Sequence, residues 1–148
     1  MKTTIFYLPA CVAVVFAFST TLFAQKKAKD KVLAYNTYTV EMTETTAKKA
    51  GKTESDEISF KSEKLNSKFM ISQNHFPAAT YTVSVDSSSG SKEISFQSDG
   101  KNPDGEEIKW AGTVTSKDIE GTVVISKKGK TKKEYSFTGS LKEKPAKK

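Results

Sequence analysis

Apolar and polar residues alternate in short runs along most of the chain, and this period of two restricts the folds open to it. One such run is Tyr81-Thr82-Val83-Ser84-Val85, and related runs recur between Tyr38 and Leu141. Successive side chains of a β-strand point to opposite faces, so alternation is typical of strands with one buried face. Clusters rich in Gly, Asn, Asp and Ser separate the runs. The pattern predicts an all-β protein of seven or eight short strands, arranged as an antiparallel sandwich or barrel.

The segment 61–79, KSEKLNSKFMISQNHFPAA, interrupts the alternation. Four of its residues are too apolar for a free loop, namely Phe69, Met70, Ile71 and Phe76. Pro77 disfavours a helical conformation for the residue before it. We therefore expect a short helical or irregular plug here, with a helical turn around 68–73, that closes one mouth of the barrel.

Each of the last three runs contains a glycine, a residue that strand interiors normally avoid. The three are Gly112, Gly121 and Gly139. If the first connecting turn centres between residues 116 and 117, and the second on residue 130, Gly112 faces Gly121 and Gly121 faces Gly139. The sequence thus predicts a row of glycines across three neighbouring strands.

A row without side chains lets a sheet coil sharply and leaves a shallow trough on its buried face. Two interpretations of that trough follow from the sequence. Either a side chain from the opposite wall, such as Phe60 or Tyr81, fills it, or it is the floor of a small apolar cavity. The residues that would line such a cavity and bind a ligand are Phe60, Tyr81, Phe96, Trp110, Gly112, Gly121, Phe137 and Gly139.

The first 24 residues have the features of a secretory signal peptide. Lys2 precedes an almost uncharged apolar run, residues 5–18, and the small Ala24 precedes a basic segment. We expect cleavage after Ala24 and export to the periplasm or the extracellular space. The mature chain would then have a basic segment at 25–31, a barrel domain at 32–142 and a basic disordered tail at 143–148. It would contain no cysteine, because Cys11 is the only one.

All 24 basic residues are lysines, and with 17 acidic residues they give a net charge of +7. Specific recognition of phosphates or bases depends on the planar fork of arginine, so we expect no specific nucleic-acid partner. A lysine-rich surface instead favours weak electrostatic contact with anionic envelope surfaces. The lysines cluster in QKKAKDK (25–31), KKGKTKK (127–133) and KEKPAKK (142–148). A second interpretation of these clusters is that they are solvated loop tips and tails.

Residues that carry catalytic or metal chemistry are scarce. His75 is the only histidine, and no Gly-x-Ser-x-Gly elbow accompanies the many serines. The spacing of Asp99 and Asp104 does not match the every-second-residue ligands of a calcium loop. We therefore expect no catalytic residues, no metal site, no cofactor and no enzymatic activity.

Three segments near the C-terminus carry a resemblance to known proteins. They are Trp110-x-Gly112-Thr113-Val114, Ile119-Glu120-Gly121-Thr122 and Tyr135-Ser136-Phe137-x-Gly139. In these segments the chain resembles small secreted bacterial proteins with a lipocalin-like barrel, most of them uncharacterised. The resemblance covers roughly 56–141, although the chain lacks the Gly-x-Trp that lipocalins carry near the mature N-terminus. It implies a small antiparallel up-and-down, lipocalin-like barrel of seven or eight strands, and it does not transfer a particular ligand.

Two functions are therefore predicted for a monomeric, non-enzymatic barrel. The first is binding of a small apolar or amphipathic ligand in the interior. The alternative is a structural or interaction protein with a filled barrel that contacts envelope polymers or an acidic partner through its lysine-rich surface. A void beside the glycines would favour the first function, and a filled interior would favour the second.

Overall fold

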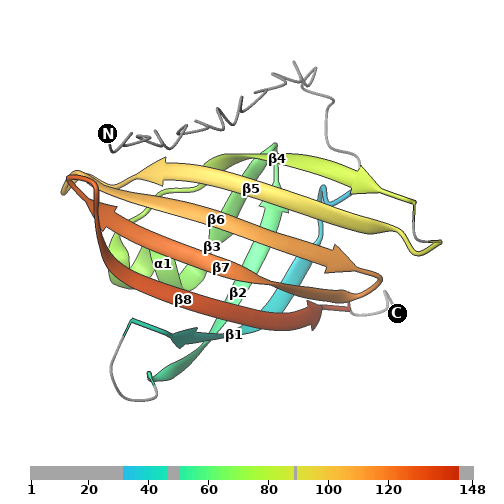
Figure 1. The fold of residues 1–148 in the computed structure, drawn as a ribbon, viewed down its shortest axis with the longest axis horizontal. Helices are drawn as coiled ribbons and strands as arrows, with labels where there is room; N and C mark the ends of the chain where they lie inside the picture. Colours follow the sequence, from blue (N-terminus) through green and yellow to red (C-terminus); the bar gives the residue numbers. More distant parts are fainter. Residues whose placement is uncertain (1–31, 47–50, 89, 144–148) are drawn as a thin grey trace, which may run out of the picture.

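In the computed structural model, eight antiparallel strands close into one barrel in which strands pair in chain order and the last strand pairs with the first (Figure 1). The structure describes residues 32–46, 51–88 and 90–143. The elements are β1 (Thr37–Glu44), β2 (Thr53–Lys61), β3 (Lys64–Ser67), α1 (Lys68–Asn74), β4 (Ala79–Asp86), β5 (Glu93–Lys101), β6 (Glu106–Thr115), β7 (Asp118–Lys127) and β8 (Lys130–Leu141). This arrangement confirms the predicted all-β barrel with a short helical element. The expected signal peptide, the segment 25–31 and residues 144–148 of the tail lie outside the described residues.

Alternation along the strands produces the barrel core. In β5, for example, Ile94, Phe96 and Ser98 are buried and the residues between them are exposed. The buried apolar side chains of the described residues form one cluster inside the barrel. Burial of this apolar surface is the main source of stability for a barrel of this size.

The predicted register between β6 and β7 is confirmed. Gly112 pairs with Gly121, and the connecting turn lies at Ser116 and Lys117. Ser116 has a φ of 59°, a left-handed conformation that suits the tight turn of a two-residue hairpin.

The predicted register between β7 and β8 is wrong by two residues. Gly121 pairs with Phe137, and Gly139 pairs with Ile119 and, on β1, with Val40. The turn lies at Lys128 and Gly129 rather than around residue 130, and a bulge follows between residues 125 and 126 of β7 and their partners on β8. A shift of two residues keeps every side chain on its predicted face, so the alternation cannot distinguish the predicted register from the observed one. The row of three glycines is therefore a row of two.

Helix α1 lies across one end of the barrel, where the sequence predicted a plug, and buries Met70. The segment 61–79 is more regular than expected, because it also contains β3, which forms a tight hairpin with β2. Ser67 caps the helix, since its hydroxyl oxygen accepts a hydrogen bond from the Met70 N–H. At the other end of the helix, Asn102 Nδ2 donates to the Asn74 carbonyl, 3.1 Å away.

Residues 32–36 cover the hydrophobic core on the side of the barrel where β1 begins. Leu33 is fully buried, although it belongs to no strand. The Tyr35 N–H donates to the Phe60 carbonyl (2.7 Å), and the Phe60 N–H donates to the Asn36 carbonyl (3.0 Å). These hydrogen bonds hold the segment against the end of β2. No helix among the described residues is long and apolar enough to cross a membrane.

Candidate functional site

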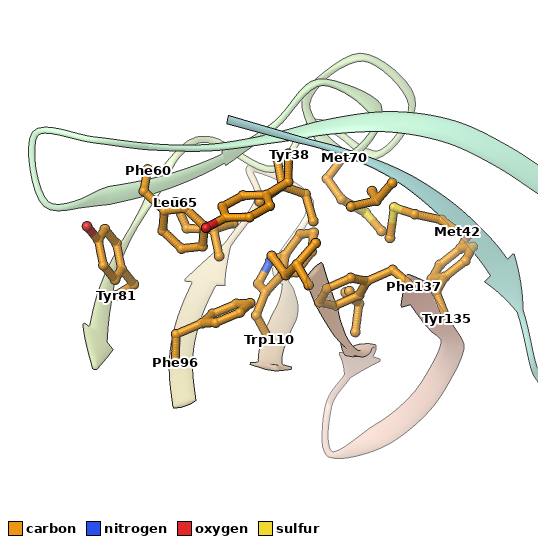
Figure 2. Packing of buried hydrophobic residues seen from close by; sticks show 14 of the residues in the cluster. Tyr38, Met42, Phe60, Leu65, Met70, Tyr81, Phe96, Trp110, Tyr135 and Phe137 are labelled. Atoms are coloured by element: carbon orange, nitrogen blue, oxygen red, sulfur yellow. The ribbon is translucent and has the colours of Figure 1, made fainter. Parts of the chain in front are cut away.

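The predicted aromatic residues meet inside the barrel (Figure 2). The Phe60 ring packs edge-on against Tyr81 and Phe96, with centroid distances of 4.9 Å and 5.1 Å. Phe137 lies 5.7 Å from Trp110 and 6.4 Å from Phe96. All five side chains are buried. The five predicted aromatic residues, which come from five strands, therefore form one continuous cluster.

Phenylalanine rings from the neighbouring strands cover the two paired glycines. A Cβ atom placed on Gly112 would lie 2.6 Å from Cζ of Phe96, and one on Gly121 would lie 2.7 Å from Cζ of Phe137. The cross-strand order is thus Phe96, Gly112, Gly121, Phe137. The trough predicted at this place is filled, and its filling comes from adjacent strands rather than from Phe60 or Tyr81 on the opposite wall.

Gly139 has a different surrounding from the other two glycines. A Cβ atom there would lie 2.1 Å from the backbone oxygen of Thr39 and 2.7 Å from Cγ1 of Val40. Gly139 therefore allows β8 to approach β1 closely at the seam that closes the barrel. Gly139 is therefore not part of the row that Gly112 and Gly121 form.

The predicted set of lining residues leaves out several side chains that complete the interior. The Tyr38 ring lies 6.0 Å from Phe60, and Met70 enters from α1 (Figure 2). Tyr38 alternates with Val40 and Met42, so its inward face could have been recognised. Leu33 carried no such signal, because the apolar run 32–35 to which it belongs does not alternate with polar residues.

Short polar side chains line a groove on the outer face of the sheet, behind the paired glycines. This groove of about 550 Å³ crosses β5, β6, β7 and β8. Its outward-facing residues are Ser95, Gln97, Ala111, Thr113, Glu120, Thr122, Ser136 and Thr138. The groove follows from the sharp coiling that the glycines permit.

Helix α1 is fixed to β2 by a buried carboxylate. Asp56 Oδ1 accepts hydrogen bonds from the N–H groups of Phe69 (2.8 Å) and Glu57 (2.7 Å). Asp56 Oδ2 accepts one from the Ser67 hydroxyl. A negative charge at this position also complements the positive end of the helix dipole. This network explains the burial of Asp56 as a structural anchor.

Glu57 joins two lysines from distant parts of the chain. One of its carboxylate oxygens pairs with Lys142 and the other with Lys68. The hydrogen bond from Lys142, followed by that from Lys68, lowers the pKa of Glu57 from 4.5 to about 2. A cleft of about 610 Å³ lies beside this network, lined among others by Tyr35 and Leu141.

The hairpin that joins β7 and β8 concentrates positive charge. We call residues 127–133 the lysine hairpin. It contains five lysines, and none of them forms an ion pair with a described residue: Lys127, Lys128, Lys130, Lys132 and Lys133. At its tip Lys128 and Gly129 have φ values of 51° and 75°, which suit a type I′ turn. The lysines are thus carried on a two-stranded arm with a defined turn.

Burial raises the pKa of the Tyr135 hydroxyl at the base of this hairpin above its ordinary value, whereas neighbouring Lys133 acts in the opposite direction.

In the described parts of the chain, no three His, Cys, Asp or Glu side chains lie close enough together to hold a metal ion.

Comparison of the chain with protein-family models, with curated proteins and with solved structures gave no significant match.

Proposed function

We propose that this protein is a non-enzymatic, exported barrel that binds an acidic polymer of the cell envelope through its lysine hairpin. The observation that carries the proposal is the cluster of five lysines without ion-pair partners among the described residues. The filled interior supports it as well, because a packed barrel leaves the outer surface as the part available for binding.

The chemistry of lysine suits a polymeric anion. Each ammonium group is a compact point charge on a flexible stem, so it meets carboxylates or phosphates without demanding one geometry. Several such charges on one hairpin attract a polyanion cooperatively, and salt weakens the attraction because exposed charges are screened.

Elution from immobilised heparin, used as a model polyanion, tests the proposal. The variant carries glutamine at Lys128, Lys130 and Lys132, which are all exposed. The control carries glutamine at three other exposed lysines, Lys61, Lys92 and Lys109, and so has the same net charge. We expect the hairpin variant to elute at clearly lower salt than the control. Equal elution of the two variants would mean that total charge alone governs binding, and the proposal would then be wrong.

A second candidate function is binding of a small apolar ligand inside the barrel. Leu33 bears on it, because this fully buried side chain covers the core from a segment that belongs to no strand. To enter the interior, a ligand would have to displace core side chains such as Leu33. Native mass spectrometry of protein from an exporting host checks this: extra mass that is lost on denaturation supports it, and a clean mass with no uptake of an apolar fluorescent probe opposes it.

A further inference from the structure

Strand β4 is paired on both sides only where it begins. Lys64 and Leu65 of β3 pair with Thr80 and Ala79, and there the pairing of β3 with β4 ends. On its other side β4 pairs with β5 as far as Asp86. The residues 82–86 of β4 therefore have no described strand beside them on the β3 side, where the β4–β5 hairpin reaches beyond the short β3 (Figure 1). We call this stretch the open edge of β4.

The backbone of the open edge presents hydrogen-bonding groups in a known direction. The Tyr81 N–H donates to the Glu63 carbonyl, 3.3 Å away, and so points toward the β2–β3 turn. Backbone groups of alternate residues in a strand point the same way. The N–H and carbonyl groups of Val83 and Val85 therefore also point toward the open side.

Apart from Asp86 at its end, the side chains of the open edge do not protect it. Natural edge strands usually carry lysines, prolines or bulges that block pairing with another chain. The stretch 80–91 contains no lysine and no proline, in a chain with 24 lysines. Val85 is 44% exposed and Val83 is only partly buried, although both lie on the inward face of the sheet.

We propose that a second copy of this chain pairs antiparallel with the open edge, related by a two-fold axis at Ser84. In that register Ser84 faces Ser84 of the second copy, and Val83 faces Val85. Because Val83 and Val85 direct their backbone groups outward, each Val83–Val85 pair exchanges both of its hydrogen bonds. The two valines of each copy then form one apolar row across the joint.

Charge and length fit the same register. Thr82 faces Asp86 of the second copy, so the incoming strand ends next to the β2–β3 turn. The exposed side chains of Lys61 and Lys64 flank this turn, and neither forms an ion pair with a described residue. The carboxylate of Asp86 from the second copy therefore approaches two lysines, which outweigh the single carboxylate of Glu63 in the turn. These complementary features favour a second copy over an unrelated peptide.

Cysteine cross-linking tests the register directly. Position 84 is the one position of the open edge that faces itself, and opposed residues at a pair without hydrogen bonds lie close enough for a disulfide. With Cys11→Ala as background, we expect Ser84→Cys to give a covalent dimer under mild oxidation. Thr82→Cys is the matched control, because it is also exposed on the same face but would face Asp86. Equal cross-linking of both variants, or of neither, overturns the proposal.

Analytical ultracentrifugation of the protein from an exporting host gives an independent test. We expect a concentration-dependent dimer that Val85→Pro abolishes, because proline removes an outward N–H without touching the β4–β5 ladder. Val85→Thr keeps that N–H and should leave the dimer intact, and the circular dichroism of both variants should match the parent. A parent protein that stays monomeric, or one that dimerises only after residues 25–31 are deleted, overturns the proposal, since in the second case the chain's own segment covers the edge.

Discussion

Two glycines and two phenylalanines constrain one another in the wall of the barrel. Each ring, together with backbone atoms of the partner strand, occupies the place that a side chain at the neighbouring glycine would need. This arrangement compensates for the packing that a glycine loses in a strand. The aromatic cluster is thus part of the wall, and its rings are fixed by cross-strand pairing as well as by burial.

Alanine at Gly112 should destabilise the barrel by about 1–3 kcal/mol, because the added carbon meets both the Phe96 ring and the backbone oxygen of Glu120. The cost should be smaller in a Phe96→Leu background, which removes the ring atom that it meets. Gly139→Ala is the control. The carbon added there would meet the backbone oxygen of Thr39 rather than the Phe96 ring, so Phe96→Leu should not reduce its cost. Urea denaturation of the four-member cycle measures the coupling, and full additivity at Gly112 would contradict the proposed dependence.

The pairing of Glu57 with two lysines predicts a pH dependence with a definite sign. The pKa of Glu57 is lowered to about 2 in the folded protein from 4.5, so the folded state favours the ionised form. Its stabilising effect is present above pH 4.5 and disappears as the pH falls toward 2. We expect Glu57→Gln to lower the melting temperature at pH 7 and to have little effect near pH 2. Glu120→Gln, at an exposed position without a described ion pair, should show no such difference.

At the scale of elements, the alternation predicted which face of the sheet each side chain occupies better than it predicted which residues pair across neighbouring strands. The β6–β7 register was correct because its turn falls between two polar residues that end both runs. The predicted β7–β8 register is wrong because the turn lies at Lys128 and Gly129, and an even shift leaves the alternation intact. The contact between Phe137 and Gly121 depends on that register, so it could not be foreseen from the faces alone.

The attachment of α1 to β2 depends on one carboxylate. In Asp56→Asn an amide nitrogen replaces the oxygen that accepts from Ser67, and the negative charge near the helix start is lost. We expect a loss of about 1–3 kcal/mol in the free energy of unfolding. Hydrogen exchange should also become faster at the amides of Phe69 and Met70. Asp99→Asn, at an exposed position of β5, should change neither quantity.

On the scale of the whole molecule, the core is covered by elements that are not barrel strands. Helix α1 contributes Met70 at one end, and the segment before β1 contributes Leu33. The plug was predictable, because an apolar stretch without alternation stood out among the strands. The role of Leu33 was not, since the continuous apolar run 32–35 has no alternation that would distinguish a buried side chain from an exposed one.

Leu33→Ala should therefore cost about 2–5 kcal/mol, as expected for truncation of a fully buried leucine. The control is Ile71→Ala on α1, where the side chain is 41% exposed and the cost should be much smaller. Equal midpoints of urea denaturation for the two variants would show that the segment before β1 contributes little to the core.

The pairing of β1 with β8 joins residues about as far apart in the chain as the barrel allows, such as Tyr38 and Leu141. Every other neighbouring pair of strands is also adjacent in sequence, so the strands form a ring. A circular permutant that links the two described ends and opens the chain between β4 and β5 would make β1 and β8 a local hairpin. The slow, long-range closure would then fall between β4 and β5. Which seam closes last is therefore set by where the backbone is cut.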